Sequence, residues 1–199
     1  MDLVSRVKGI LLSPKSEWAT IDTEAASVSS LYTGYVMILA AISPICAFIG
    51  LSIIGTNILG TAWKSPMGPG LTYAISTYVM ALVGIYVIAL IIDALAPTFG
   101  GQKSQMQALK VAAYSATAAW VGGVFALLPA LGIIALLLSL YSLYLLYLGL
   151  PVLMKAPKEK AVGYTIVVVI CMIVVFVVAG IVTRMVAPGA MPTLGGLTR

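Results

Sequence analysis

Five long runs of apolar residues, separated by short polar breaks, dominate the sequence. The last two cover residues 131–154 and 161–186, and the break between them at 155–160 reads Lys-Ala-Pro-Lys-Glu-Lys. Each of these two runs exceeds the roughly 20 apolar residues that a helix needs to cross a bilayer. Three earlier runs have the same character and lie at about residues 31–54, 71–95 and 109–128. The pattern predicts an all-α, polytopic membrane protein with five transmembrane helices.

The start of the chain shows a different pattern, that of a short amphipathic helix. In residues 2–12 the apolar side chains recur at the spacing of one helix face, while Arg6 and Lys8 fall on the other side. Such a helix is too short to span a bilayer but suits the membrane surface. We therefore expect a short N-terminal interfacial arm with its basic side chains facing outward.

A second short helix is expected in the same arm. Ser13 followed by Pro14 is typical of a helix start, and the helix should cover about residues 14–22. Because tryptophan is favoured at the depth of the lipid headgroups, we expect Trp18 to face the membrane interface. The predicted organisation has three parts, namely an arm with its linker at 1–30, a five-span membrane domain at 31–186 and a flexible tail at 187–199.

Basic residues are unequally divided between the two sides of such a bundle. With the N-terminus inside, the inner segments carry most of the 11 Lys and Arg residues, namely Arg6, Lys8, Lys15, Lys103, Lys110, Lys155, Lys158 and Lys160. The outer segments carry only Lys64, Arg184 and Arg199. Because lysine and arginine are retained on the cytoplasmic side, this bias predicts a cytoplasmic N-terminus and a periplasmic C-terminus.

Composition agrees with a lipid environment. The chain is 61% hydrophobic and 9% charged, whereas soluble domains carry about 25% charged residues. The cations are spread over several loops, which excludes the clustered basic face of a nucleic-acid-binding protein. Charged residues interrupt the first 30 positions, so no cleavable signal peptide is expected.

Asp93 is the single acidic residue in any predicted span. Because an ionised carboxylate in hydrocarbon is costly unless it is paired or hydrated, two interpretations stay open. Asp93 is a proton or cation site, or it lies at interface depth, solvated or paired with Lys110 at the start of the third span. Tyr114 lies one turn deeper, and Tyr144 belongs to a tyrosine stripe on the fourth span. The candidate polar intramembrane cluster is therefore Asp93, Lys110, Tyr114 and Tyr144.

Small residues and tyrosines mark the third and fourth spans. Small side chains recur on one face of the third span, at Ala112, Ala116, Ala119 and Gly123. Such faces let helix backbones approach closely in lipid, so the third span should be central, with a homodimer face as the alternative. Because this span is short, a re-entrant hairpin with the fourth span also stays open. Buried tyrosine hydroxyls need partners, so the stripe of Tyr141, Tyr144 and Tyr147 is expected to face protein or water.

Motifs for catalysis and for cofactor binding are missing. The sequence contains no histidine, no G-x-S-x-G, no C-x-x-C and no phosphate-binding loop. Without histidine the chain lacks the commonest metal ligand and the usual proton shuttle. We expect no enzymatic activity, no metal and no cofactor.

The last two spans also carry a distinctive spacing of aromatic, glycine, proline and lysine residues. It reads Tyr141-x-x-Tyr144-x-x-Tyr147-x-Gly149-x-Pro151, then Lys155-x-Pro157-x-x-Lys160-Ala161-x-Gly163-Tyr164. Earlier parts of the pattern are Phe99-Gly100-Gly101, Ala113-Tyr114 and Ser13-Pro14-x-x-x-Trp18-x-x-Ile21. Over nearly its whole length the chain resembles the bacterial branch of the Yip1 family of integral membrane proteins.

The resemblance implies a five-helix protein of the bacterial inner membrane with a cytoplasmic N-terminus. Eukaryotic members bind Rab-type GTPases and act in vesicle traffic. We do not expect that activity to carry over directly, because about 30 residues precede the first span in this sequence and bacteria lack the Golgi pathway. The resemblance supplies no catalytic residues.

The expected function is therefore non-enzymatic, the organisation of membrane or partner proteins through the cytoplasmic face. Its candidate contact surface consists of Lys155, Lys158, Lys160 and Trp18. The expected partners are membrane lipids and a membrane or cytoplasmic protein, not a nucleic acid, and a homo-oligomer is left open. The alternative is a small transporter, channel or lipid-translocating protein that uses a polar cavity near Asp93, Lys110, Tyr114 and Tyr144.

Overall fold

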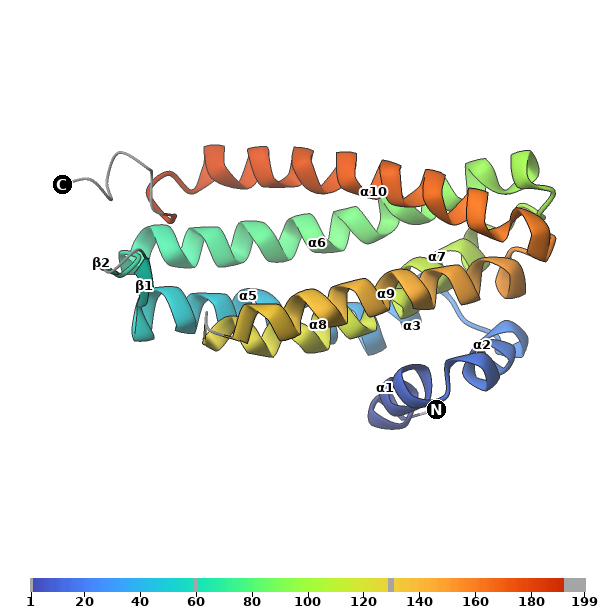
Figure 1. Cartoon of the computed structure of the whole chain (residues 1–199), viewed down its shortest axis with the longest axis horizontal. Helices are drawn as coiled ribbons and strands as arrows, with labels where there is room; N and C mark the ends of the chain where they lie inside the picture. The colour runs from blue at the N-terminus through green and yellow to red at the C-terminus, as the bar shows by residue number, and fades with distance from the viewer. Residues whose placement is uncertain (1, 59–60, 129–130, 192–199) are drawn as a thin grey trace.

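The computed structural model describes residues 2–58, 61–128 and 131–191, which form a bundle of long helices with a two-helix arm at one end (Figure 1). Five stretches are long and apolar enough to cross a membrane, namely Val28–Ile54, Met67–Phe99, Gln105–Leu127, Gly132–Leu153 and Lys158–Val186. The predicted all-α, five-span fold is confirmed.

The predicted arm is present as two consecutive helices, α1 (Leu3–Leu12) and α2 (Pro14–Thr23), joined at Ser13. Both lie against one end of the bundle (Figure 1), called the arm end below; the opposite end is the far end. Pro14 occupies the first turn of α2, where a missing N–H costs no hydrogen bond. The linker predicted up to residue 30 is shorter, because Ser27 and Ser30 form a reciprocal cap that starts α3 (Val28–Leu31).

The first span is a broken helix. It continues from α3 through a π-helical turn, η1 (Tyr32–Val36), into α4 (Met37–Ala40), α5 (Ile42–Phe48) and a second π-helical segment, η2 (Ile49–Ile54). The interruption at Ala41 follows from Pro44, which has no N–H for the carbonyl of Ala40.

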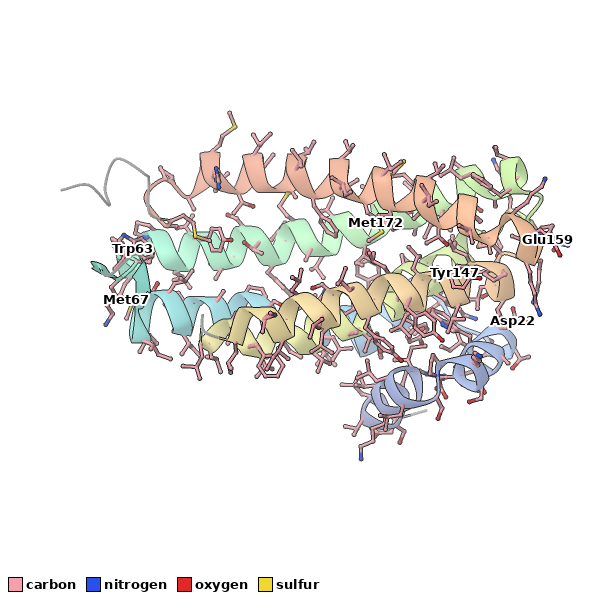
Figure 2. All side chains as sticks on the ribbon, viewed as in Figure 1. Asp22, Trp63, Met67, Tyr147, Glu159 and Met172 are labelled. Carbon is pink, nitrogen blue, oxygen red and sulfur yellow. The ribbon has the colours of Figure 1, made fainter. Side chains whose placement is uncertain are left out.

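The far end carries a small hairpin that the sequence pattern did not predict. Strand β1 (Thr56–Ile58) pairs antiparallel with β2 (Thr61–Trp63), with Thr56 opposite Trp63. The second span, α6 (Met67–Leu95), begins four residues earlier than expected. Figure 2 shows Trp63 and Met67 at the far end, and Asp22 and Glu159 at the arm end.

Turns at the arm end are tighter than the polar pattern indicated. Helix α6 runs into a 3-10 turn, η3 (Ala96–Phe99), and Gly100 then takes a left-handed conformation (φ 75°) that favours glycine. Ser104 caps α7 (Gln105–Ser115), which continues as α8 (Thr117–Gly122) and the 3-10 segment η4 (Gly123–Leu127). The last two spans are α9 (Gly132–Leu153) and α10 (Lys158–Val186).

The third span is the centre of the bundle, as its small residues predicted. In its most apolar stretch 67% of the residues are buried inside the protein, against 6–33% in the other four spans. It runs alongside α9 towards the far end (Figure 1), so the re-entrant alternative is not adopted. Of the predicted flexible tail, residues 192–199 lie outside the described residues.

Gly123 lies at a close approach between the first and third spans. A Cβ added there would lie 1.9 Å from Ser43 Oγ and 2.8 Å from Ser43 Cα, so the backbone of α5 would have to move. We expect Gly123→Ala to lower the free energy of unfolding by about 1–3 kcal/mol, measured by SDS titration in mixed micelles. Gly180→Ala, which would meet no atom within 4 Å, is the matched control, and equal losses in both variants would contradict the close approach.

Candidate functional site

Arg6 organises a buried charged cluster between the arm and the bundle. It is 4% exposed, and its guanidinium donates to the Glu17 carboxylate at 2.5 Å and to both carboxylate oxygens of Glu24. Gly9 leaves room for this pairing, since a Cβ at that position would lie 2.5 Å from the Glu17 carboxylate. The prediction that Arg6 faces outward is wrong, because two carboxylates on α2 and its C-cap compensate its burial.

Arg6 keeps its charge in this setting. Burial opposes the charged form, but the hydrogen bond to Glu24 and the fields of Glu24, Tyr114 and Glu17 outweigh that effect, so the pKa of Arg6 lies above its ordinary value. The guanidinium carbon also lies 5.5 Å from the centre of the Tyr114 ring, within the range of a cation–π contact.

Lys110 binds the end of the second arm helix. It is 3% exposed, and its Nζ donates to the carbonyl oxygens of Ile21 at 2.9 Å and of Glu24 at 2.6 Å. These carbonyls lie at the C-terminus of α2. The helix dipole favours a cation there, and the Lys110 ammonium donates hydrogen bonds to carbonyl oxygens that have no partner within the helix. Gln107, one turn earlier in α7, donates to the Asp22 carbonyl and to its carboxylate. The start of the third span therefore holds the arm in place.

Aromatic side chains fill the space beneath the charged cluster. Tyr114 makes edge-to-face contacts with Trp18 at 6.4 Å and with Tyr35 at 4.7 Å between ring centres. The Tyr35 hydroxyl is 2.7 Å from Thr117 Oγ1, which links the first and third spans. Beside them a pocket of about 240 Å³ is lined by Arg6, Glu24, Tyr35 and Tyr114 among others.

Trp18 is fully buried and does not belong to the contact surface predicted for it. Its ring lies on Gly149 of α9, where an added Cβ would come within 2.8 Å of the indole carbons. The expectation of an interfacial tryptophan is wrong because Gly149 provides a flat backbone on which the indole packs. Nearby, the Tyr141 hydroxyl donates to the Leu11 carbonyl at 2.8 Å and so holds the end of α1.

The hairpin at 155–160 completes the arm end. Lys155 has a left-handed backbone (φ 54°) and forms an ion pair with Asp22. The backbone N–H of Gln102 donates to the Met154 carbonyl at 2.7 Å, so the turn between the second and third spans packs on this hairpin. Lys158 and Lys160, in the first turn of α10, are exposed and make no ion pair with the described carboxylates.

The predicted polar intramembrane cluster is only partly assembled. Lys110 and Tyr114 both adjoin the arm, and of the interpretations left open for Asp93 the pairing with Lys110 is not formed, because Lys110 is directed to the arm carbonyls. Asp93 is half-buried on α6, and its Oδ1 has no hydrogen-bond partner among the described residues. Tyr144 is 42% exposed and tilts against Tyr141, 5.6 Å between ring centres. Within the stripe, Tyr141 is half-buried, whereas Tyr144 and Tyr147 are partly exposed.

Tyr164 connects the second and last spans beside Asp93. It is fully buried, its hydroxyl donates to the Ile92 carbonyl, and its ring stacks on Phe99 at 4.9 Å. A Cβ on Gly101 would lie 2.7 Å from the Met154 carbonyl, which accounts for a glycine where the two turns meet. Within the described ranges, no three His, Cys, Asp or Glu side chains come together as a metal site.

Comparison with known proteins identifies the family. The model of the Yip1 domain matches residues 8–179. The chain belongs to the Yip1 family. It is 31% identical over 166 residues to the inner membrane protein YohC of Escherichia coli K12, covering 81% of this chain and 85% of that protein. YohC of Escherichia coli O6:H1 matches to the same extent, and no solved structure matches significantly. This Yip1 protein is accordingly a multi-pass inner-membrane protein.

The family residues recognised in the sequence converge on the arm end of this Yip1 protein. The contacts described above join Trp18 to Gly149, Trp18 to Tyr114, and Phe99 to Tyr164. Sequence reasoning missed Arg6, Glu17 and Glu24 as a buried cluster. A signal was present, since one cation and two anions occur on adjacent short helices joined by the single residue Ser13.

Proposed function

We propose that this Yip1 protein is a non-enzymatic organiser of the inner membrane, which holds lipids or partner proteins against its cytoplasmic face. In this proposal the arm end is cytoplasmic and the far end periplasmic. The division of basic residues supports that orientation, with Lys64, Arg184 and Arg199 alone assigned to the far side.

The observation that carries the proposal is the docking of the arm. Lys110, Tyr141 and Lys155, on three different parts of the bundle, bind the arm through its carbonyls and Asp22. The polar groups of this region hold the arm in place, as expected of a preformed surface. Five lysines of this region are exposed and form no ion pair with the carboxylates that the structure describes, namely Lys8, Lys15, Lys103, Lys158 and Lys160.

A cluster of 4–8 cations next to a transmembrane helix attracts anionic headgroups by about 1 kcal/mol per residue. The five lysines fall within that number, although the hairpin alone, with three, does not. The attraction is electrostatic, so it should weaken as salt shortens the Debye length from about 10 Å at 0.1 M.

The transporter alternative depends on a single polar cavity that the four candidate residues share, and they do not share one. It predicted one polar cavity shared by Asp93, Lys110, Tyr114 and Tyr144, but Lys110 is engaged with the arm and Tyr144 is exposed on the outside of α9. Lys110 and Tyr114 serve the arm junction instead.

Site-specific photocrosslinking in the native inner membrane tests the proposal. A photoreactive residue at Lys158 should capture one protein in a stoichiometric, salt-sensitive complex or anionic lipid in excess of its membrane fraction. The same probe at Lys64, an exposed lysine at the far end, is the matched control. The double variant K8E/K103E, which reverses two of the exposed charges of this face and leaves the probe in place, should lower the capture at least about threefold. Identical products at both positions, insensitive to charge reversal, would exclude an organising cytoplasmic face.

A further inference from the structure

The far half of the bundle contains cations but no acidic residue. All six Asp and Glu residues of the sequence belong to the arm, the inner end of α6 or the hairpin, namely Asp2, Glu17, Asp22, Glu24, Asp93 and Glu159. Arg184, in the last turn of α10, therefore has no Asp or Glu side chain near it and makes no ion pair among the described residues. Arg184 is exposed, and an arginine near a helix end reaches the membrane interface, where a lipid phosphate can supply its counter-charge.

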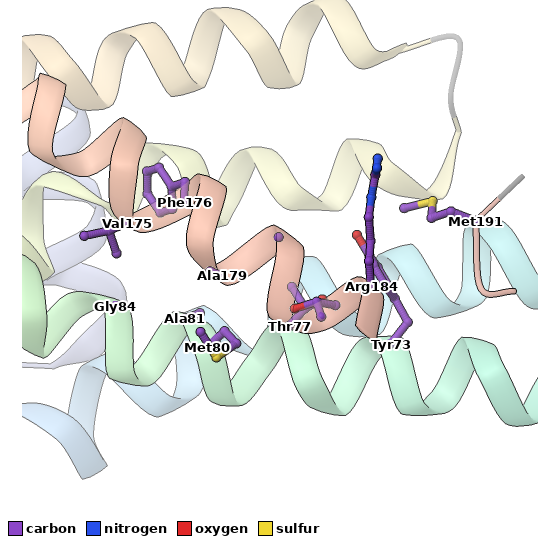
Figure 3. A pocket seen from close by; sticks show the side chains of 12 residues that line it. Tyr73, Thr77, Met80, Ala81, Gly84, Val175, Phe176, Ala179, Arg184 and Met191 are labelled. Atoms are coloured by element: carbon purple, nitrogen blue, oxygen red, sulfur yellow. The ribbon is translucent and has the colours of Figure 1, made fainter. Parts of the chain in front are cut away.

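Arg184 lies at the end of a groove between α6 and α10. The groove has a volume of about 540 Å³, within the roughly 300–1,000 Å³ of small-molecule sites. Small and apolar side chains line most of its length, among them Met80, Ala81, Gly84, Val175, Phe176 and Ala179. Figure 3 shows Val175 and Phe176 towards one end, and Tyr73, Arg184 and Met191 at the other.

Polar groups concentrate at the Arg184 end of the groove. Tyr73 and Thr77 of α6 and Thr183 of α10 line it there with Arg184. The hydroxyl oxygen of Thr77 is buried and has no hydrogen-bond partner within the part of the chain that the structure describes. The site thus combines a long apolar trough with one cation and hydroxyl donors at a single end.

From this arrangement we infer that the groove binds one phospholipid of the far-end leaflet, with its phosphate at Arg184 and one acyl chain along α6 and α10. A guanidinium is suited to phosphate because it donates two parallel, charge-assisted hydrogen bonds. The apolar trough continues from Arg184 towards the middle of the bundle, as an acyl chain does from its headgroup. A free phosphate ion would leave the trough unfilled, and an apolar helix would leave Arg184 without a counter-charge.

Native mass spectrometry of the purified full-length protein tests the inference. Phosphatidylglycerol and a diacylglycerol with the same acyl chains are titrated in parallel, so that they differ only in the headgroup. The wild-type protein should retain one phosphatidylglycerol and bind it about tenfold more tightly than the diacylglycerol, which is the ratio expected for about 1.4 kcal/mol. Arg184→Gln should bind the two lipids equally. Lys64→Gln removes another far-end cation, outside the groove, and should keep the preference.

A second variant tests the trough independently of the charge. At Gly180, which lines the groove, an added Cβ would meet no atom within 4 Å, so Gly180→Leu starts its side chain in open space and places added volume at the groove. It should lower the affinity for both lipids at least about fivefold, whereas Gly68→Leu, at an equally open far-end position outside the groove, should not. Unchanged binding in Arg184→Gln and Gly180→Leu would overturn the inference. So would a disulfide from a cysteine at 180 to a second copy or another protein, which would make the groove a helix–helix interface. The result does not depend on the function of the arm end.

Discussion

Replacing Arg6 by methionine should be one of the two most damaging single changes in this protein. The substitution keeps the apolar stem but leaves the Glu17 carboxylate, whose side chain is 11% exposed, without its counter-charge. Removing one partner of a buried ion pair costs about 3–5 kcal/mol, because the other charge stays buried and unpaired. We expect a loss of that size in SDS titrations, together with new proteolytic cleavage between α2 and α3, since the arm detaches from the bundle.

Two further variants identify the cause of the loss at Arg6. Lys8→Met removes a charge from the same helix at an exposed position, and it should change stability by less than about 0.5 kcal/mol. Adding Glu17→Gln to Arg6→Met removes the stranded charge and should recover part of the stability, which a double-mutant cycle measures. If Arg6→Met behaves like Lys8→Met, the buried cluster does not hold the arm.

The second large effect is expected at Trp18. Truncation to alanine removes a fully buried indole at the contact of α2, α9 and Tyr114. Such truncations cost about 3–5 kcal/mol, from lost burial and from the cavity left behind. The loss should appear as a lower midpoint of SDS unfolding, whereas Leu12→Ala in the same arm, at a side chain 79% exposed, should leave the midpoint nearly unchanged.

Gly149 provides a cross-check on the geometry of this contact. Gly149→Ala alone should destabilise by about 1–3 kcal/mol, because its Cβ would overlap the indole. In the Trp18→Ala background the same change should cost nothing, since the ring is absent and the methyl group enters the cavity. Additive losses in the double variant would mean that the indole does not rest on Gly149.

The sequence pattern predicted the parts of this structure that depend on hydrophobic periodicity and length. Apolar runs of sufficient length defined the five spans, and the small residues of the third span predicted its central place. Ser13-Pro14 marked the junction of the two arm helices. In each case a local sequence feature decides a local structure, so no knowledge of the tertiary contacts was required.

The site was harder to predict, because its contacts join segments far apart in the chain. An amphipathic pattern assigns charged residues to the outer face, which placed Arg6 outside; its partners Glu17 and Glu24 lie 11 and 18 residues away on another element. Asp93 was one of the partners considered for Lys110 because it is a carboxylate, whereas carbonyls at a helix C-terminus leave no mark in the sequence. Trp18 followed the general preference of tryptophan for headgroup depth, which the contact with Gly149 overrides.

The docking of the arm also has a consequence for biosynthesis. The arm leaves the ribosome first, yet the groups that hold it come much later in the chain. Lys110 binds carbonyls 86 and 89 residues before it, Tyr141 reaches back 130 residues and Lys155 reaches back 133. The arm therefore cannot complete its docking until the fourth span and the hairpin have been made, and only its internal pairing around Arg6 is available before then. A protease that cleaves exposed arms would therefore selectively remove chains whose insertion had stopped before the hairpin.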